Sequence, residues 1–123
     1  MMNKVITVQS TTIDEFLRQH GDPPIGFIKM DIEGAEPSAV SGMAGLLRRS
    51  QQLSVILEFC PRFLRVAGTN PAAFLSYLHT QFTECSVLAT DGSLCRAQMG
   101  SIESTMREGE TGYVNLLCRK TQH

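Results

Sequence analysis

Four short apolar runs recur along this chain, and they constrain its fold more than any other feature. They span residues 26–32, 53–59, 84–90 and 113–120, and a shorter β-branched run lies at 5–8. Helix signals between them give the order strand, helix, strand, helix, strand, helix, strand and a final strand. Because helical crossovers join parallel strands, we expect an α/β fold with a mostly parallel sheet, closed by an antiparallel pair of the last two runs. The near-continuous run 53–59 is typical of a strand covered on both faces.

The helix signals are caps, prolines and glycines. Thr12 and Glu15 have capping-box spacing, and Gly21 is the expected end of that first helix. Asn70 followed by Pro71 predicts a helix over 70–82. We also expect a helix from Pro37, in which Gly42 and Gly45 allow close packing or a break. The remaining expectations are a loop or short helix over 61–68, a turn at 91–92, and a loop with a helical turn over 98–112.

Length and composition limit the classes of protein to be considered. A chain of 123 residues is enough for one core, so we expect a single domain over residues 1–123. The net charge of −1 does not favour a nucleic acid partner. No apolar run reaches the roughly 18 residues that span a bilayer, and residues 1–12 lack a signal-peptide core. We therefore expect a cytoplasmic protein without a membrane partner.

The four cysteines, at positions 60, 85, 95 and 118, form no CxxC pair, and no histidine stands at ligand spacing to them. A zinc site needs such spacing, so the interpretation is reduced, partly buried thiols and no bound metal.

Charged residues gather where the first two strong strands end. Asp31 and Glu33 lie at the exit of the 26–32 run, and Glu58 lies at the exit of the next run. Parallel neighbours are about 5 Å apart, so these carboxylates are expected to share one site at the carboxyl end of the sheet. Strand alternation places Lys29 on the same face as Asp31.

Each of these residues also has a purely structural interpretation. Glu33 and Glu36 are suited to the positive end of the following helix, and Asp31 to a turn or cap. Lys29 is suited to an ion pair with Glu58 or Asp31. The coincidence of several charges at two adjacent strand ends favours a functional site.

Three segments together resemble the second half of the FkbM family of S-adenosylmethionine-dependent methyltransferases. They are Thr12-Ile13-Asp14, the strand exit KMDIEGAE at 29–36 followed by Gly42, and Leu57-Glu58. The resemblance implies a Rossmann-like sheet in which the 26–32 strand is the fourth and the 53–59 strand the fifth. It also implies O-methylation of a hydroxyl on a sugar, lipid or secondary metabolite, with S-adenosylmethionine as cofactor.

Under this interpretation the expected catalytic residues are Asp31, Glu33 and Glu58, which would orient or deprotonate the acceptor hydroxyl. Lys29, Gly34 and Glu36 are expected near the substrate or cofactor.

The family's N-terminal, cofactor-binding half has no counterpart in this chain, whose ten glycines form no GxG pair. Residues 1–123 therefore resemble a partial methyltransferase domain. Without inner neighbours the 26–32 strand becomes an exposed edge, so we expect it to pair with itself or another polypeptide, or the chain to be marginally stable.

Two alternatives remain beside the enzyme. One is a non-catalytic remnant or interaction module of the same fold. The other is a hydrolase or phosphotransferase that binds magnesium through Asp31, Glu33 and Glu58.

Overall fold

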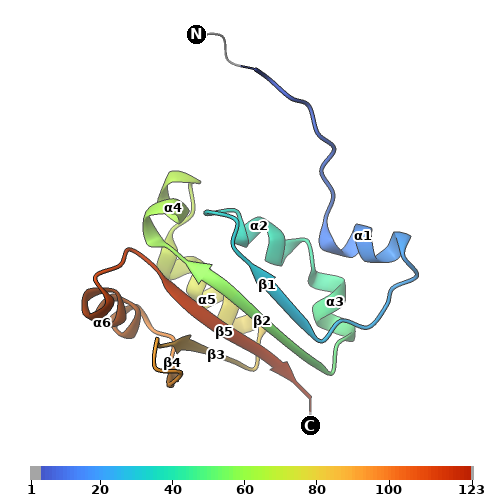
Figure 1. The fold of residues 1–123 in the computed structure, drawn as a ribbon. Coiled ribbons are helices and arrows are strands. Elements are labelled where there is room, and N and C mark those ends of the chain that lie inside the picture. The colour runs from blue at the N-terminus through green and yellow to red at the C-terminus, as the bar shows by residue number, and fades with distance from the viewer. Residues whose placement is uncertain (1–3, 123) are drawn as a thin grey trace.

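The computed structural model describes residues 4–122, which form five strands and six helices (Figure 1). In chain order these are α1 (Ile13–Gln19), β1 (Phe27–Met30), α2 (Glu36–Ser41), α3 (Ala44–Arg49), β2 (Gln52–Phe59), α4 (Pro61–Val66), α5 (Pro71–Gln81), β3 (Glu84–Leu88), β4 (Leu94–Arg96), α6 (Met99–Gly109) and β5 (Val114–Thr121).

The five strands form one mixed sheet in the order β1-β2-β5-β3-β4. Only β1 and β2 are parallel; the β2–β5, β5–β3 and β3–β4 ladders are antiparallel. The expected mostly parallel, Rossmann-like sheet is therefore wrong. The crossovers do give β1, β2 and β3 one common direction, but β5 enters between β2 and β3 and runs opposite to both. The expected antiparallel pairing of the last two apolar runs is confirmed by the β3–β5 ladder.

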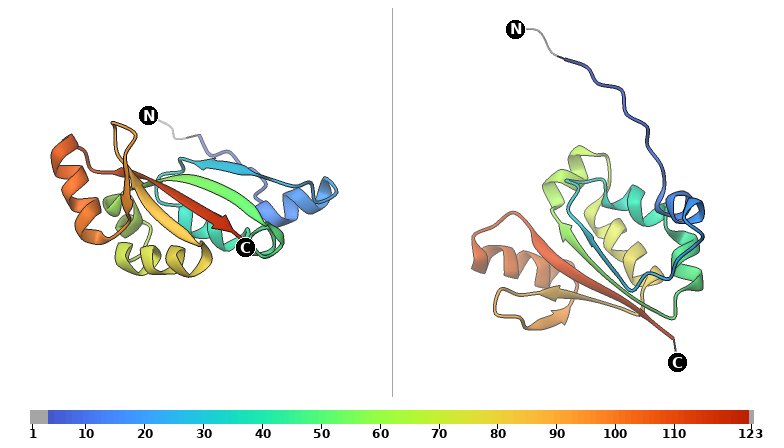
Figure 2. Two further views of the ribbon diagram at one scale, coloured as in Figure 1. Left: turned by 90° about the horizontal axis from the view of Figure 1, so that it is seen from below. Right: turned by 45° about the vertical axis from the view of Figure 1, so that its right-hand side comes forward.

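The sheet has one covered face and one open face. In Figure 2 the helices gather on one side of the sheet. Along β2, Leu53, Val55, Leu57 and Phe59 are buried on the covered side, whereas the residues between them are half-buried. The expectation that 53–59 is covered on both faces is therefore wrong within residues 4–122, because the described helices cover only one face.

β1 lies at the end of the sheet, as the sequence predicted for an edge. Its side chain Phe27 is 57% exposed on the open face. The β-branched run at 5–8 forms no strand: Val5, Ile6 and Val8 are exposed in a segment that extends away from the sheet (Figure 1). This expected strand is wrong because no neighbouring strand bonds to the segment.

The helices follow the sequence signals with one exception, α6. The helix expected from Pro37 is broken between Ser41 and Ala44, as its glycines allow, and 61–68 contains the short helix α4. The 98–112 segment is not a loop with one turn but an 11-residue helix, α6. The sequence patterns did not predict strand β4.

Asp14 ties the first helix to the third. Its carboxylate accepts hydrogen bonds from the backbone N–H groups of Gly45 (2.8 Å) and Leu46 (2.9 Å) at the start of α3. The α3 cap residue, Met43, makes no side-chain capping bond. A distant carboxylate therefore performs the capping that the local sequence lacks.

Candidate functional site

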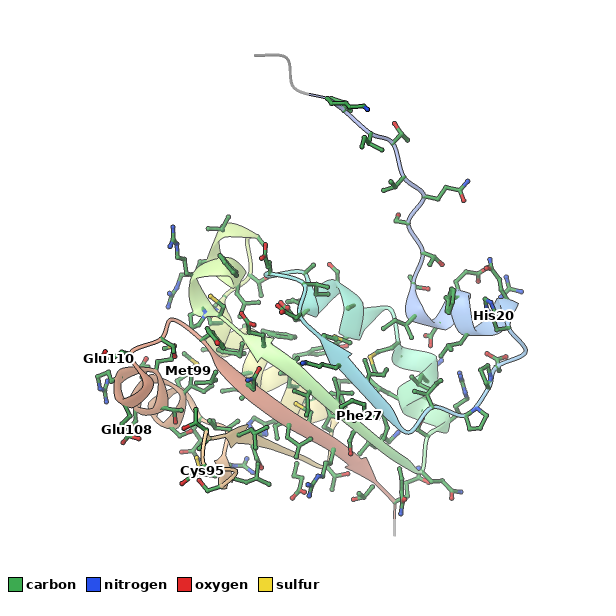
Figure 3. The ribbon with its side chains drawn as sticks, in the orientation of Figure 1. His20, Phe27, Cys95, Met99, Glu108 and Glu110 are labelled. Carbon is green, nitrogen blue, oxygen red and sulfur yellow. The ribbon has the colours of Figure 1, made fainter. Side chains whose placement is uncertain are left out.

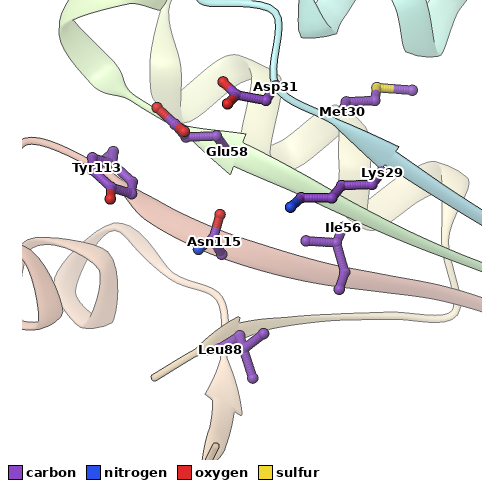
Figure 4. Close-up of a pocket in the computed structure, with 8 residues that line it drawn as sticks. All are labelled: Lys29, Met30, Asp31, Ile56, Glu58, Leu88, Tyr113 and Asn115. Carbon is purple, nitrogen blue, oxygen red and sulfur yellow. The ribbon is translucent and has the colours of Figure 1, made fainter. Parts of the chain in front are cut away.

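A cleft of about 320 Å³ lies on the open face at the carboxyl ends of β1 and β2 (Figure 4). Its wall is formed by residues of β1, β2, β3 and β5, by the residue after β1 and by the residue before β5. The lining residues are Lys29, Met30, Asp31, Ile56, Glu58, Leu88, Tyr113 and Asn115.

Asp31 and Glu58 meet in this cleft because β1 and β2 are parallel neighbours. Met30 is the register partner of Leu57, so the next residues along the two strands, Asp31 and Glu58, also lie side by side. Figure 4 shows both carboxylates at the same end of the cleft. The strand-end argument from the sequence correctly placed this pair together.

The pKa of Glu58 is raised above its ordinary value. Burial is the largest cause, followed by the negative charge of Asp31 and a hydrogen bond with it; Glu36 and Glu33 add smaller repulsions. Burial and like charges both disfavour the ionised carboxylate. Glu58 therefore holds its proton to a higher pH than a solvated glutamate does, and is the stronger base once the proton is gone.

Two further polar side chains face the pair. Asn115 is the register partner of Glu58 across the β2–β5 ladder. The Lys29 side chain runs along the open face toward Glu58 and Asn115 (Figure 4). Among residues 4–122 the ion pairs within 4.0 Å do not include Lys29, so the structural ion pair considered for it is not formed here.

The other three candidate residues lie outside the cleft wall, Glu33 and Gly34 in the loop after β1 and Glu36 at the start of α2. Glu36 is only 2% exposed, and its carboxylate accepts hydrogen bonds from the N–H groups of Ile32 (3.0 Å) and Gly34 (2.9 Å). Glu33 is exposed and has a left-handed backbone, with φ of 53°. Glu36 thus holds the turn that orients the strand exit.

Gly34 is required for packing. Its φ is +100°, and a Cβ there would lie 2.6 Å from the carbonyl oxygen of Phe63 in α4. The loop and α4 therefore approach each other too closely for any other residue.

Tyr113 and Asn115 also line the cleft, and no sequence pattern predicts either of them there. Both positions depend on the β2–β5 register, which pairs residues more than fifty positions apart in the chain and has no local signal.

Comparison with protein-family models matches residues 3–108 to the methyltransferase FkbM domain. The chain belongs to the FkbM methyltransferase family. Membership implies, in general, S-adenosylmethionine as methyl donor and a small methyl acceptor. No significant match was found among curated proteins, and none among solved structures.

The strand exit after β1 does not fit S-adenosylmethionine. The amides at the β1 exit already bind Glu36, and the space beside Gly34 is filled by the backbone of Phe63. The loop is consequently not a glycine cradle for a ligand. What residues 4–122 offer is the open cleft with its two carboxylates, a lysine and an amide.

No group of three or more His, Cys, Asp or Glu side chains among residues 4–122 is placed to hold a metal ion. The helices of this span are all too short or too polar to cross a lipid bilayer.

Additional side chains of the molecule are drawn in Figure 3, where Phe27 stands on β1 and Cys95 on the short strand β4 at the opposite end of the sheet.

Proposed function

We propose that this chain is the acceptor side of an S-adenosylmethionine-dependent O-methyltransferase that acts on a hydroxyl of a sugar, lipid or secondary metabolite. The observation that carries the proposal is the Asp31–Glu58 pair in the cleft of a chain that belongs to a methyltransferase family.

The chemistry assigned to this chain is the handling of the acceptor proton. Glu58, made more basic by burial and by Asp31, accepts the hydroxyl proton, and Asp31 orients the hydroxyl by accepting a hydrogen bond. Lys29 and Asn115 bind the acceptor oxygen and its neighbours. Glu33, on the adjacent loop, contributes negative charge that strengthens Glu58 as a base.

The proposal includes a polypeptide partner along β1, either a second copy or another chain, which completes the cofactor site. Its support is the edge position of β1, the exposed Phe27 on that strand, and the helix-free face of the sheet. Unpaired apolar edges pair readily with other strands.

The test is transfer of a labelled methyl group from S-adenosylmethionine to a panel of sugar and lipid hydroxyls, at a protein concentration at which sedimentation shows the chain to be associated. The parent is compared with Asp31→Asn, Glu58→Gln and the control Glu103→Gln, whose side chain is exposed on α6. Loss of a catalytic base costs about 100-fold or more in rate. We expect that loss in both cleft variants and none in the control; equal rates in all four proteins would contradict the assignment.

The second candidate is a non-catalytic remnant or interaction module of the same family. The observation that favours it is the strand-exit loop, whose amides and glycine serve the protein's own packing. A folded chain that binds no S-adenosylhomocysteine in any state of association would support this candidate over the enzyme.

A further inference from the structure

Cys85 and Cys118 face each other directly across the β3–β5 ladder. They are register partners, and their side chains lie on the covered side of the sheet with exposures of 1% and 0%. Both are free thiols in this structure. The proposed methyltransferase chemistry uses neither of them.

The backbone hydrogen bonds define what kind of pair they form. The carbonyl of Cys85 accepts from Ala97 N–H (2.9 Å), and Ala89 N–H donates to Ser93 (2.9 Å), both toward the β4 side of β3. Alternate residues of a central strand bond to opposite neighbours, so Cys85 does not bond to β5. Cys85 and Cys118 are therefore a non-hydrogen-bonded antiparallel pair.

This type of pair brings side chains closest together. Its Cα atoms are about 4.5 Å apart, within the range of about 4.4–6.8 Å that a disulfide spans. The other two cysteines have no such partner: Cys95 is opposite Val87, and Cys60 lies outside the sheet.

We propose that Cys85 and Cys118 are a redox site, at which a peroxide converts the two thiols into a cross-strand disulfide. The Cys85 thiolate attacks one oxygen of the peroxide, and the O–O bond breaks. The attacked oxygen stays on sulfur as a sulfenic acid, and the other oxygen is protonated and leaves as water. The Cys118 sulfur then attacks the Cys85 sulfur and a second water leaves. Two thiols and one hydrogen peroxide thus give one disulfide and two waters.

The environment assigns the two roles. The contact with Cys118 lowers the pKa of Cys85, and the same contact, together with burial, raises the pKa of Cys118. Cys85 is assigned the attacking role because its strand, β3, lies next to the edge strand β4, whereas Cys118 lies on β5 between β2 and β3 and is the resolving thiol. Access is expected from this edge of the sheet, because the edge strand β4 beside β3 has only three residues, all of them exposed. Short edge strands open locally at low cost.

The disulfide would fix β3 to β5 three residues from the cleft on each strand. Leu88 on β3 and Asn115 on β5 are themselves register partners and line the cleft. Oxidation is thus expected to stabilise the fold and to fix the position of this part of the cleft wall.

The experiment uses the full chain with Cys60→Ser and Cys95→Ser as parent, so that only the proposed pair remains. The folded parent is treated with hydrogen peroxide, then unfolded and alkylated, and its intact mass is measured by mass spectrometry. We expect a monomer lighter by two hydrogens, with both thiols protected from alkylation, a higher urea midpoint, and reversal of both effects by dithiothreitol.

The matched control adds Cys118→Ala, which leaves Cys85 without a resolving partner and should yield no intramolecular disulfide. The parent alone can overturn the proposal, whether or not this control folds. Two alkylatable thiols after peroxide treatment would contradict it, as would separate oxidation of the two sulfurs or a cross-linked dimer.

Discussion

Glu58→Gln is expected to stabilise the protein at neutral pH and to have no such effect in acid. The pKa of Glu58 is raised in the folded chain, so the folded state binds this proton more tightly than the unfolded state. Between the unfolded pKa, about 4.3, and the higher folded pKa, the folded state holds more protons, and stability falls as the pH rises. Glutamine does not ionise, so the variant does not suffer this loss.

The size of the effect follows from the geometry of the pair. Asp31 and Glu58 lie side by side on strands about 4.8 Å apart. Two like charges at about 5 Å repel by about 0.8 kcal/mol at the dielectric constant of water and by about 3 kcal/mol at an effective constant of 20. Because the cleft is open and Glu58 is only half-buried, the lower part of this range applies, and we expect a gain of about 1 kcal/mol.

The assay is urea unfolding of the parent, Glu58→Gln and the exposed control Glu103→Gln at about pH 4, 5.5 and 7, which brackets the ordinary glutamate pKa. The gain in free energy of unfolding should appear at the upper values and vanish at the lowest. In a protein that already carries Asp31→Asn, the further change Glu58→Gln should give a smaller gain, since the repelling charge of Asp31 is absent. Equal stability of parent and Glu58→Gln at pH 7, or a gap that widens in acid, would refute the reasoning.

Three other changes test the fold around the site. Gly34→Ala and Gly92→Ala both place alanine at positive φ, which costs about 1–3 kcal/mol, but only Gly34 has backbone within 2.6 Å of the new Cβ. Gly34→Ala should therefore lose at least about 1 kcal/mol more in urea unfolding, and equal losses would contradict the contact with α4. Asp14→Ala should cost about 0.5–2 kcal/mol by removing the α3 cap, whereas Asp14→Asn, which keeps one acceptor, should cost less. Phe27→Lys should abolish concentration-dependent sedimentation if β1 is the pairing edge; unchanged association would place the interface elsewhere.

Local signals were enough to predict the main elements. The apolar runs 26–32 and 53–59 and the Asn70-Pro71 cap are short-range signals, and the structure has strands and a helix there. The helix α6 was missed because its cap is the unusual pair Gln98 and Ser101, and its buried apolar residues are few.

The order of the strands depends on long-range contacts that no local pattern records. β5 bonds to β2 and β3 across the sheet, so the mostly parallel arrangement inferred from the crossovers was wrong. The same limit applies to the site. Asp31 and Glu58 could be placed together because parallel neighbours end at the same edge, whereas Tyr113 and Asn115 required the β2–β5 register.

We propose that residues 4–122 supply the acceptor side of a methyltransferase and need a second polypeptide to complete the cofactor site. Calorimetric titration with S-adenosylhomocysteine tests it most directly, with the state of association set by protein concentration and verified by sedimentation. We predict no saturable binding by the monomer and binding only when a second copy or a partner chain is joined to it. Saturable binding by a verified monomer would contradict the claim.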